Sequence, residues 1–144
     1  MSQYILDTNH LRAYEYLQPK LMAKVMAIGM SQIAITGITV EEQAQGWLKA
    51  IRSASQAPLA RRAEKFGWAY GGLRMSVQMV NRFEILDFSG TSYERFLEFR
   101  RQGIRISTHD LQIAAIAIDV GGVVVTQNLR DFEQVPGLRV ENWL

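Results

Sequence analysis

The sequence predicts an α/β sandwich with a mainly parallel central sheet flanked by helices. Short apolar runs alternate with longer segments of helical pattern along the 144 residues, which is the order typical of parallel strands joined by helices. The run 123–126 is β-branched and apolar on both faces, as expected for an inner strand covered by helices. A chain of this length forms one core and is short for two domains, so we expect a single domain over residues 1–144.

The first half of the chain alternates strands with helices. An apolar run that stops at Asp7 predicts the first strand, and the helix after it is interrupted near Pro19. The small, polar stretch 53–58 predicts a connection, and the pair Gly71-Gly72 indicates a bend in the helix that follows. The elements expected here are strand 4–6, the interrupted helix, strand 33–36, helix 39–52 and helix 59–80.

The second half continues the same alternation. Residues 111–120 have a helical pattern and are almost wholly apolar, so we expect this helix to be buried. The pair Gly121-Gly122 then leads into the inner strand. The elements expected here are strand 83–86, helix 89–101, loop 103–108, helix 111–120, strand 123–126, a helical turn over 128–134 and strand 138–140.

Composition excludes several classes of protein. Hydrophobic residues make up 48% and charged residues 21% of the chain, which is typical of a folded domain and not of a disordered one. There is no cysteine, which excludes disulfides, thiolate metal sites and thiol nucleophiles. The start has no signal-peptide pattern, and no run of about 18 apolar residues occurs. We therefore expect a cytoplasmic protein with no membrane contact. The net charge of +2 does not distinguish a nucleic-acid binder from a solvated helix surface.

Four acidic residues fall at junctions between the expected elements. Asp7 follows the first strand, Glu42 opens the helix after the second, Asp110 opens the buried helix and Asp131 lies just beyond the inner strand. In an open parallel sheet, residues from separate strand-to-helix turns converge beyond the carboxyl ends of the strands. Carboxylate oxygens are the ligands that Mg²⁺ and Mn²⁺ prefer, and gathered acids repel one another without a cation.

A purely structural explanation also exists for three of these acids, because each stands three residues after a helix-capping residue and so fits a capping box. The pairs are Thr39 with Glu42, Ser107 with Asp110, and Asn128 with Asp131. Acids in the first turn also interact favourably with the helix dipole. Asp7 leads no such box, because Leu11 stands three residues after Thr8. The capping explanation is therefore least complete for Asp7.

The four acids lie in four blocks, and these are LDTN (6–9), ITVEEQAQG (38–46), DLQIAA (110–115) and VTQNLRDF (125–132), with PGLRVENW (136–143) as the tail. In this order and at these separations the blocks resemble the PIN-domain family, and specifically its VapC-like branch of toxin ribonucleases from bacterial toxin–antitoxin pairs. The resemblance covers nearly the whole chain and implies the PIN-like form of the sandwich. In the family, the acid of the second block stands four residues before a glycine, so the position of Gly46 indicates Glu42 and not Glu41. The chain departs from the family pattern at the next position, where Gln43 replaces the usual leucine.

The resemblance also implies roles for individual residues. Asp7, Glu42, Asp110 and Asp131 are the expected catalytic carboxylates. Asp7 and Asp110 are expected to bind Mg²⁺, or Mn²⁺, directly, while Glu42 and Asp131 hold a second ion or orient water. The hydrogen-bonding residues expected to hold the acids in place are Thr8, Asn9 and Thr126, with Asn128 sharing or replacing the role of Asp131.

The expected function is hydrolysis of single-stranded or looped RNA by a metal-dependent endoribonuclease, with a cognate antitoxin and a second copy of the chain as protein partners. Two alternatives were weighed. An aspartate-nucleophile phosphatase needs a second acid two residues after Asp7, where this chain has Asn9. A non-catalytic PIN-like module that binds RNA or protein remains open, although the complete set of four acids argues against it. His109, beside Asp110, is either a general base or a surface side chain at a helix start.

Overall fold

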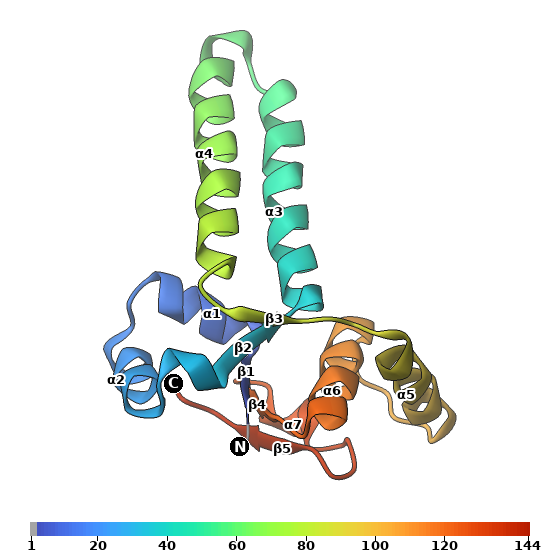
Figure 1. Ribbon diagram of the computed structural model, residues 1–144. Helices are drawn as coiled ribbons and strands as arrows, with labels where there is room; N and C mark the ends of the chain where they lie inside the picture. Colours follow the sequence, from blue (N-terminus) through green and yellow to red (C-terminus); the bar gives the residue numbers. More distant parts are fainter. Residues whose placement is uncertain (1–2) are drawn as a thin grey trace.

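The protein, described by a computed structural model over residues 3–144, is an α/β sandwich with a projecting pair of helices (Figure 1). Met1 and Ser2 of the predicted domain lie outside the described residues. The elements, in chain order, are β1 (Tyr4–Leu6), α1 (Thr8–Glu15), α2 (Pro19–Ile28), η1 (Met30–Gln32), β2 (Ile33–Thr36), α3 (Gly37–Ser55), η2 (Leu59–Arg61), α4 (Arg62–Val80), β3 (Glu84–Leu86), α5 (Gly90–Arg101), α6 (Thr108–Val120), β4 (Val123–Val125), α7 (Leu129–Phe132) and β5 (Arg139–Glu141).

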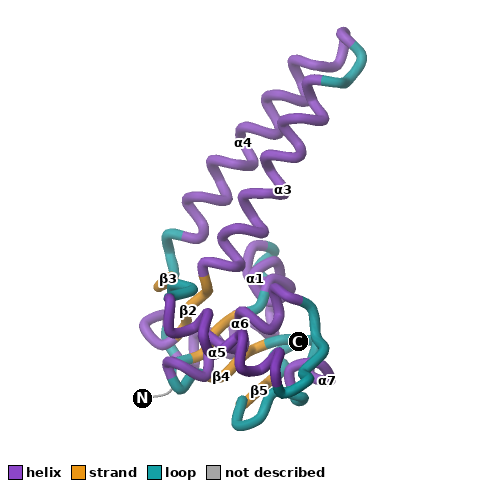
Figure 2. The backbone as a smooth tube through the Cα atoms, turned by 90° about the vertical axis from the view of Figure 1, so that its right-hand side faces the viewer, coloured by secondary structure: helices purple, strands orange, loops and turns teal. Residues whose placement is uncertain are grey.

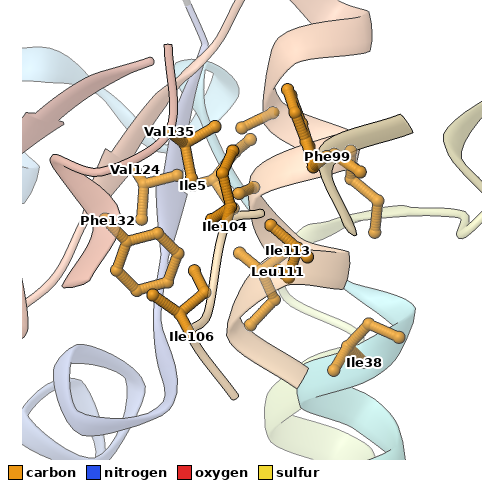
Figure 3. Close-up of a cluster of buried hydrophobic side chains, with 14 residues drawn as sticks. Ile5, Ile38, Phe99, Ile104, Ile106, Leu111, Ile113, Val124, Phe132 and Val135 are labelled. Carbon is orange, nitrogen blue, oxygen red and sulfur yellow. The ribbon is translucent and has the colours of Figure 1, made fainter. Parts of the chain in front are cut away.

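The sheet has the strand order β3-β2-β1-β4-β5, and every neighbouring pair is parallel. The predicted parallel sheet is thus confirmed, and β4 is an inner strand with all three residues buried. Side chains of a strand alternate between its two faces, and here each face has its own core. Ile5 joins the core under α5, α6 and α7, while Leu6 joins the core under α1 and α2. Figure 3 shows the first of these cores, in which Ile5 and Val124 of the sheet meet Leu111 and Ile113 of α6.

The helices α3 and α4 form a long antiparallel hairpin that stands away from the sheet (Figures 1 and 2). Each has 19 residues, which corresponds to about 28 Å of helix. The helix α3 begins at Gly37 and not at Thr39, because Thr36 at the end of β2 caps it by accepting from the backbone N–H of Thr39. It also runs to Ser55, so the predicted connection 53–58 is reduced to residues 56–58. Within residues 3–144, no helix is long and apolar enough to cross a membrane.

The bend predicted at Gly71-Gly72 is wrong, because α4 runs unbroken from Arg62 to Val80. The pair has a packing role instead. A Cβ atom at Gly72 would collide with the six-membered ring of Trp47 on α3, whereas a Cβ at Gly71 would meet nothing within 4 Å. The glycine at position 72 therefore lets the indole lie directly on the backbone of α4, and this contact sets how closely the two helices of the hairpin approach.

Alanine substitutions at the two glycines should change stability in opposite directions. We expect Gly71→Ala to stabilise the protein by about 0.5–1 kcal/mol, since alanine is the better helix former. Gly72→Ala should destabilise it by about 1–3 kcal/mol, because Trp47 must move. Urea unfolding of both variants measures the difference. Equal stabilisation by both would show that Trp47 does not pack on Gly72 in solution.

A buried histidine ties the C-terminal segment to the domain. The side chain of His10, on α1, has no exposed surface, and its Nε2 atom accepts a hydrogen bond from the backbone N–H of Trp143 at 3.1 Å. Burial lowers the pKa of His10 to about 4, which outweighs the opposite effect of a hydrogen bond with Asn142. The imidazole is therefore neutral at physiological pH, as acceptance of a backbone N–H at Nε2 requires.

This histidine should make stability depend on pH. Because the folded-state pKa lies below the unfolded value of 6.5, the unfolded chain binds more protons between pH 6.5 and about 4. The contribution of His10 is therefore complete above pH 6.5 and falls as the pH drops through that window, by up to about 3 kcal/mol. Chemical unfolding of the native protein and of His10→Gln, which keeps an acceptor for Trp143 but does not titrate, should diverge over this range. Parallel pH profiles would contradict the assignment.

Candidate active site

The site lies where the strand order of the sheet reverses. The first strand β1 lies between β2 and β4, so the connections from β1 and β4 leave in opposite directions and open a crevice beyond their carboxyl ends. Asp7 follows β1 directly, and its backbone N–H donates to the carbonyl of Val125 in β4 at 2.9 Å. Thr126 follows β4. Strand pairing alone therefore brings these two residues, far apart in sequence, to the same point.

Asp7 is held by two donors. It is the N-cap of α1, and its Oδ1 accepts the backbone N–H of Thr8 at 2.8 Å. Its Oδ2 accepts the hydroxyl of Thr126 at 2.9 Å. The carboxylate thus caps its helix with one oxygen and faces the crevice side of β4 with the other.

Glu42 reaches the site from the second turn of α3. Its Oε1 accepts the hydroxyl of Thr8 at 3.1 Å, so Thr8 joins Asp7 and Glu42. The capping box predicted for Thr39 and Glu42 does not form, because Thr36 caps this helix and leaves Glu42 free to point at the site. The choice of Glu42 over Glu41 agrees with this geometry, since Glu41 bonds to Gln45 on its own helix.

Asp110 and Asp131 are joined by Asn128. The amide nitrogen of Asn128 donates to Oδ2 of Asp110 at 3.2 Å and to Oδ2 of Asp131 at 2.9 Å. Ser107 caps α6 and accepts the backbone N–H of Asp110 at 3.2 Å, as predicted. Asn128 precedes α7 but makes no capping bond with its side chain, so the third predicted capping box is also wrong. Its amide is engaged by the two acids instead.

A single hydrogen-bonded chain therefore connects all four acids. Besides donating to Asp7, the Thr126 hydroxyl oxygen accepts the backbone N–H of Asn128 at 2.9 Å. The order along the chain is Glu42, Thr8, Asp7, Thr126, Asn128, and then Asp110 and Asp131. We name this set the acid network.

One predicted residue does not take part in the acid network. Asn9 is exposed and, within the described part of the chain, makes no hydrogen bond with any of the four acids. The reason is helical geometry. Successive residues of a helix point about 100° apart, so when Thr8 faces the acids its neighbour Asn9 turns toward solvent. The expectation that Asn9 holds an acid is therefore corrected.

Burial and repulsion act together on the two central acids. Desolvation raises the pKa of Asp7 above its usual value, and the charge of Glu42 adds to this, although the bonds from Thr8 and Thr126 oppose it. Desolvation also raises the pKa of Asp110, with further contributions from the charges of Asp7 and Asp131. The ionised form of each of these two acids is thus destabilised by at least one neighbouring acid. A cation between them would remove this cost.

Carboxylate oxygens at a repelling, half-buried pair fit a hard divalent cation in chemistry. Among residues 3–144, no group of three or more His, Cys, Asp or Glu side chains lies at metal-ligand spacing. A site for Mg²⁺ does not need three, since this ion usually takes one or two carboxylates and completes its shell with water and substrate phosphate. Asp7 and Asp110, the two acids whose pKa values are raised, therefore have the chemistry of ligands for such an ion.

A histidine borders the acid network. His109, which precedes Asp110, places Nδ1 at 3.7 Å from Oε2 of Glu42 and Nε2 at 3.6 Å from Oε1 of Glu41. Its side chain is 36% exposed, which separates it from the buried His10. The sequence shows only that His109 adjoins Asp110; its contact with two glutamates far away in the chain depends on α3 packing beside α6.

Comparison with known proteins adds independent information. No family model matches the chain. The tRNA(fMet)-specific endonuclease VapC of Salmonella typhimurium is 29% identical over 99% of both chains, and ribonuclease VapC2 of Haemophilus influenzae is 28% identical over the full length of both. The crystal structure of DNA-bound VapBC from Salmonella typhimurium contains a chain that is 28% identical, is covered completely and superimposes with a TM-score of 0.76.

These likenesses extend from end to end of the chain. They agree with the resemblance carried by the four sequence blocks. From end to end the chain is thus similar to proteins named VapC, which are called ribonucleases or endonucleases, and to a chain of a solved VapBC complex.

Proposed function

We propose that this protein is a metal-dependent endoribonuclease and the toxin of a toxin–antitoxin pair. The observation that carries the proposal is the acid network, in which four carboxylates from four separate segments are joined at the reversal point of the sheet. The names of the similar proteins support the reaction class, because they are called endonuclease or ribonuclease. The substrate class is single-stranded or looped RNA, whose backbone can bend into a crevice.

The residues divide the chemistry between them. Asp7 and Asp110 would hold Mg²⁺ or Mn²⁺, which supplies a more acidic water and neutralises charge on the scissile phosphate. Thr126 donates to Asp7 and Asn128 donates to Asp110, and these bonds restrict how each carboxylate can turn. Glu42, fixed by Thr8, and Asp131, fixed by Asn128, lie on either side and would orient the attacking water or a second ion. Water then attacks phosphorus, and the phosphodiester bond to the leaving oxygen breaks.

A protein partner is also part of the proposal. The solved relatives include toxin–antitoxin complexes, and this chain has a groove of about 680 Å³ between α1 and the hairpin. The groove runs from the end of α1 up along α4 as far as Gly67. Several large apolar side chains that line it are more than half exposed, namely Tyr16, Leu17, Trp68 and Met75. Exposed apolar area of this kind marks a protein interface. We assign the groove to a cognate antitoxin, and we expect the toxin to be a homodimer in the cytoplasm.

Removal of either central acid should abolish cleavage. We expect the purified protein to cleave RNA with Mg²⁺ or Mn²⁺ and to stop when a chelator is added. Asp7→Ala and Asp110→Ala should each lower kcat by about 100-fold or more, since each removes a ligand of the group that activates water. Glu94→Gln, which changes an exposed acid on α5, is the matched control and should leave kcat unchanged. Cleavage that survives both alanine variants would refute the proposed site, and tight RNA binding without any cleavage would favour a non-catalytic module.

The dependence of the melting temperature on pH and metal should report on the acid network, when the native protein is compared with Asp7→Asn. Because the folded-state pKa values of Asp7 and Asp110 are raised, the folded protein binds more protons than the unfolded chain above pH 3.8, and stability falls as the pH rises through the raised pKa values. In chelator, the melting temperature of the native protein should therefore drop relative to that of Asp7→Asn between pH 4 and 7, by about 3 °C for each kcal/mol.

Addition of Mn²⁺ at pH 7 should reverse this difference. The ion should raise the melting temperature of the native protein and not that of Asp7→Asn, because binding to the folded state alone stabilises it. The titration of His10 is common to both proteins and cancels in the comparison. An equal rise in both proteins would show that Mn²⁺ binds elsewhere.

A further inference from the structure

The hairpin of α3 and α4 carries an excess of positive charge. Residues 37–80 contain six basic side chains against three acidic side chains, Glu41, Glu42 and Glu64, a net charge of +3. The whole chain carries +2, so the remaining residues together carry −1. The basic side chains of the hairpin are Lys49, Arg52, Arg61, Arg62, Lys65 and Arg74. All six lie beyond Glu42, so the projecting part of the hairpin is a basic arm on a nearly neutral body.

The basic charge of the arm matters for a polyanionic substrate. The four carboxylates of the acid network repel RNA phosphates when no cation is bound. The hairpin begins at the site, because Glu42 lies in the second turn of α3. The first basic side chain beyond it is Lys49, about two turns farther along the same helix, so charge of the opposite sign follows the acids along the hairpin.

Aromatic side chains accompany the basic ones along α4. Phe66 and Tyr70 stack with ring centroids 6.3 Å apart and an angle of 28° between the planes, and Tyr70 is 56% exposed. Arg62 and Arg74 continue this row at the same spacing of four residues, which places successive side chains on neighbouring positions of one helix face. A row of arginine and exposed aromatic side chains matches RNA, in which phosphates alternate with bases that stack on aromatic rings.

From these observations we propose that the α3–α4 hairpin is an RNA-binding arm, which holds the part of a folded RNA that lies beyond the cleavage point. The occupant is RNA and not a protein segment, because the row of Arg62, Phe66, Tyr70 and Arg74 combines basic with stacking side chains. The apolar groove lies on a different face of α4, which carries Gly67, Gly71 and Met75. The inference rests on the proposed ribonuclease function for its choice of ligand. It assigns to the arm a role in affinity, while the acid network retains the chemistry.

The test compares two triple variants of equal charge. The arm variant is Lys49→Gln, Lys65→Gln and Arg74→Gln, and the control variant is Lys20→Gln, Lys24→Gln and Arg101→Gln on the body; all six side chains are exposed. The probes are a folded transfer-RNA transcript and an eight-nucleotide single strand. Binding is measured by fluorescence anisotropy in chelator over a series of salt concentrations, and cleavage is measured separately with Mn²⁺.

We expect the arm variant to bind the transcript about 10-fold or more weakly and to lose about 2 from the slope of log affinity against log salt, since each lost phosphate contact removes about 0.7–0.9. Its kcat on the short strand should be unchanged. The control variant should retain both affinity and slope. Equal losses in the two variants, or unchanged binding by the arm variant, would overturn the proposal, because net charge alone or another surface would then hold the RNA.

A second pair of variants separates stacking from folding. Tyr70→Ala should weaken binding of the transcript about 5-fold or more, and Tyr70→Phe, which keeps the ring, should restore it. Equal weakening by both would overturn the stacking role. The outcomes also separate this proposal from the proposed function: if the arm variant loses affinity but no protein cleaves RNA, only the nuclease function fails, and if cleavage depends on Asp7 but binding ignores the arm, only the arm fails.

Discussion

The parallel pairing of β1 with β4 is the constraint on which the rest of the site depends. It brings the residue after each strand, Asp7 and Thr126, within a hydrogen bond of 2.9 Å. All three residues of β4 and two of β1 are buried, so the register is fixed by apolar packing on both faces of the sheet. The hydrophobic core therefore positions the site without any further loss of side-chain flexibility by the acids. It also places Asp7 in a poorly solvated position.

That position explains why the acids are held by hydrogen-bond donors. Burial and like charges raise the pKa values of Asp7 and Asp110, so ionisation of these two acids lowers the stability of the fold. Hydroxyl and amide donors reduce this cost without removing it. The remaining repulsion lowers the free energy of unfolding below the value that packing alone would give, which is typical of functional sites. The same repulsion is what a bound cation would relieve, which links metal affinity directly to the folding energy.

The sequence predicted the sheet, and it placed the four acids at the ends of strands and helices, because both depend on local pattern. A buried strand is apolar wherever it lies, and the acids stand at strand and helix ends that can be read from neighbouring residues. The capping boxes at Glu42 and Asp131 were wrong for a tertiary reason, since Thr36 ends a buried strand and Asn128 is drawn to two acids. Asn9 was assigned by motif alone, and helical geometry turns it outward. The hairpin could not be foreseen, because nothing local to residues 37–80 states that these helices leave the sheet.

The hydroxyl of Thr126 shows how the acid network obtains a defined direction. A hydroxyl has one proton to donate and lone pairs with which to accept. Because the oxygen of Thr126 accepts the backbone N–H of Asn128, its proton is directed to Asp7. The same backbone contact fixes the start of α7 and so places the amide of Asn128 between Asp110 and Asp131. One buried hydroxyl thus couples the orientation of the acid from β1 to that of the acids from α6 and α7, and this is why four carboxylates from distant segments can act as a single site.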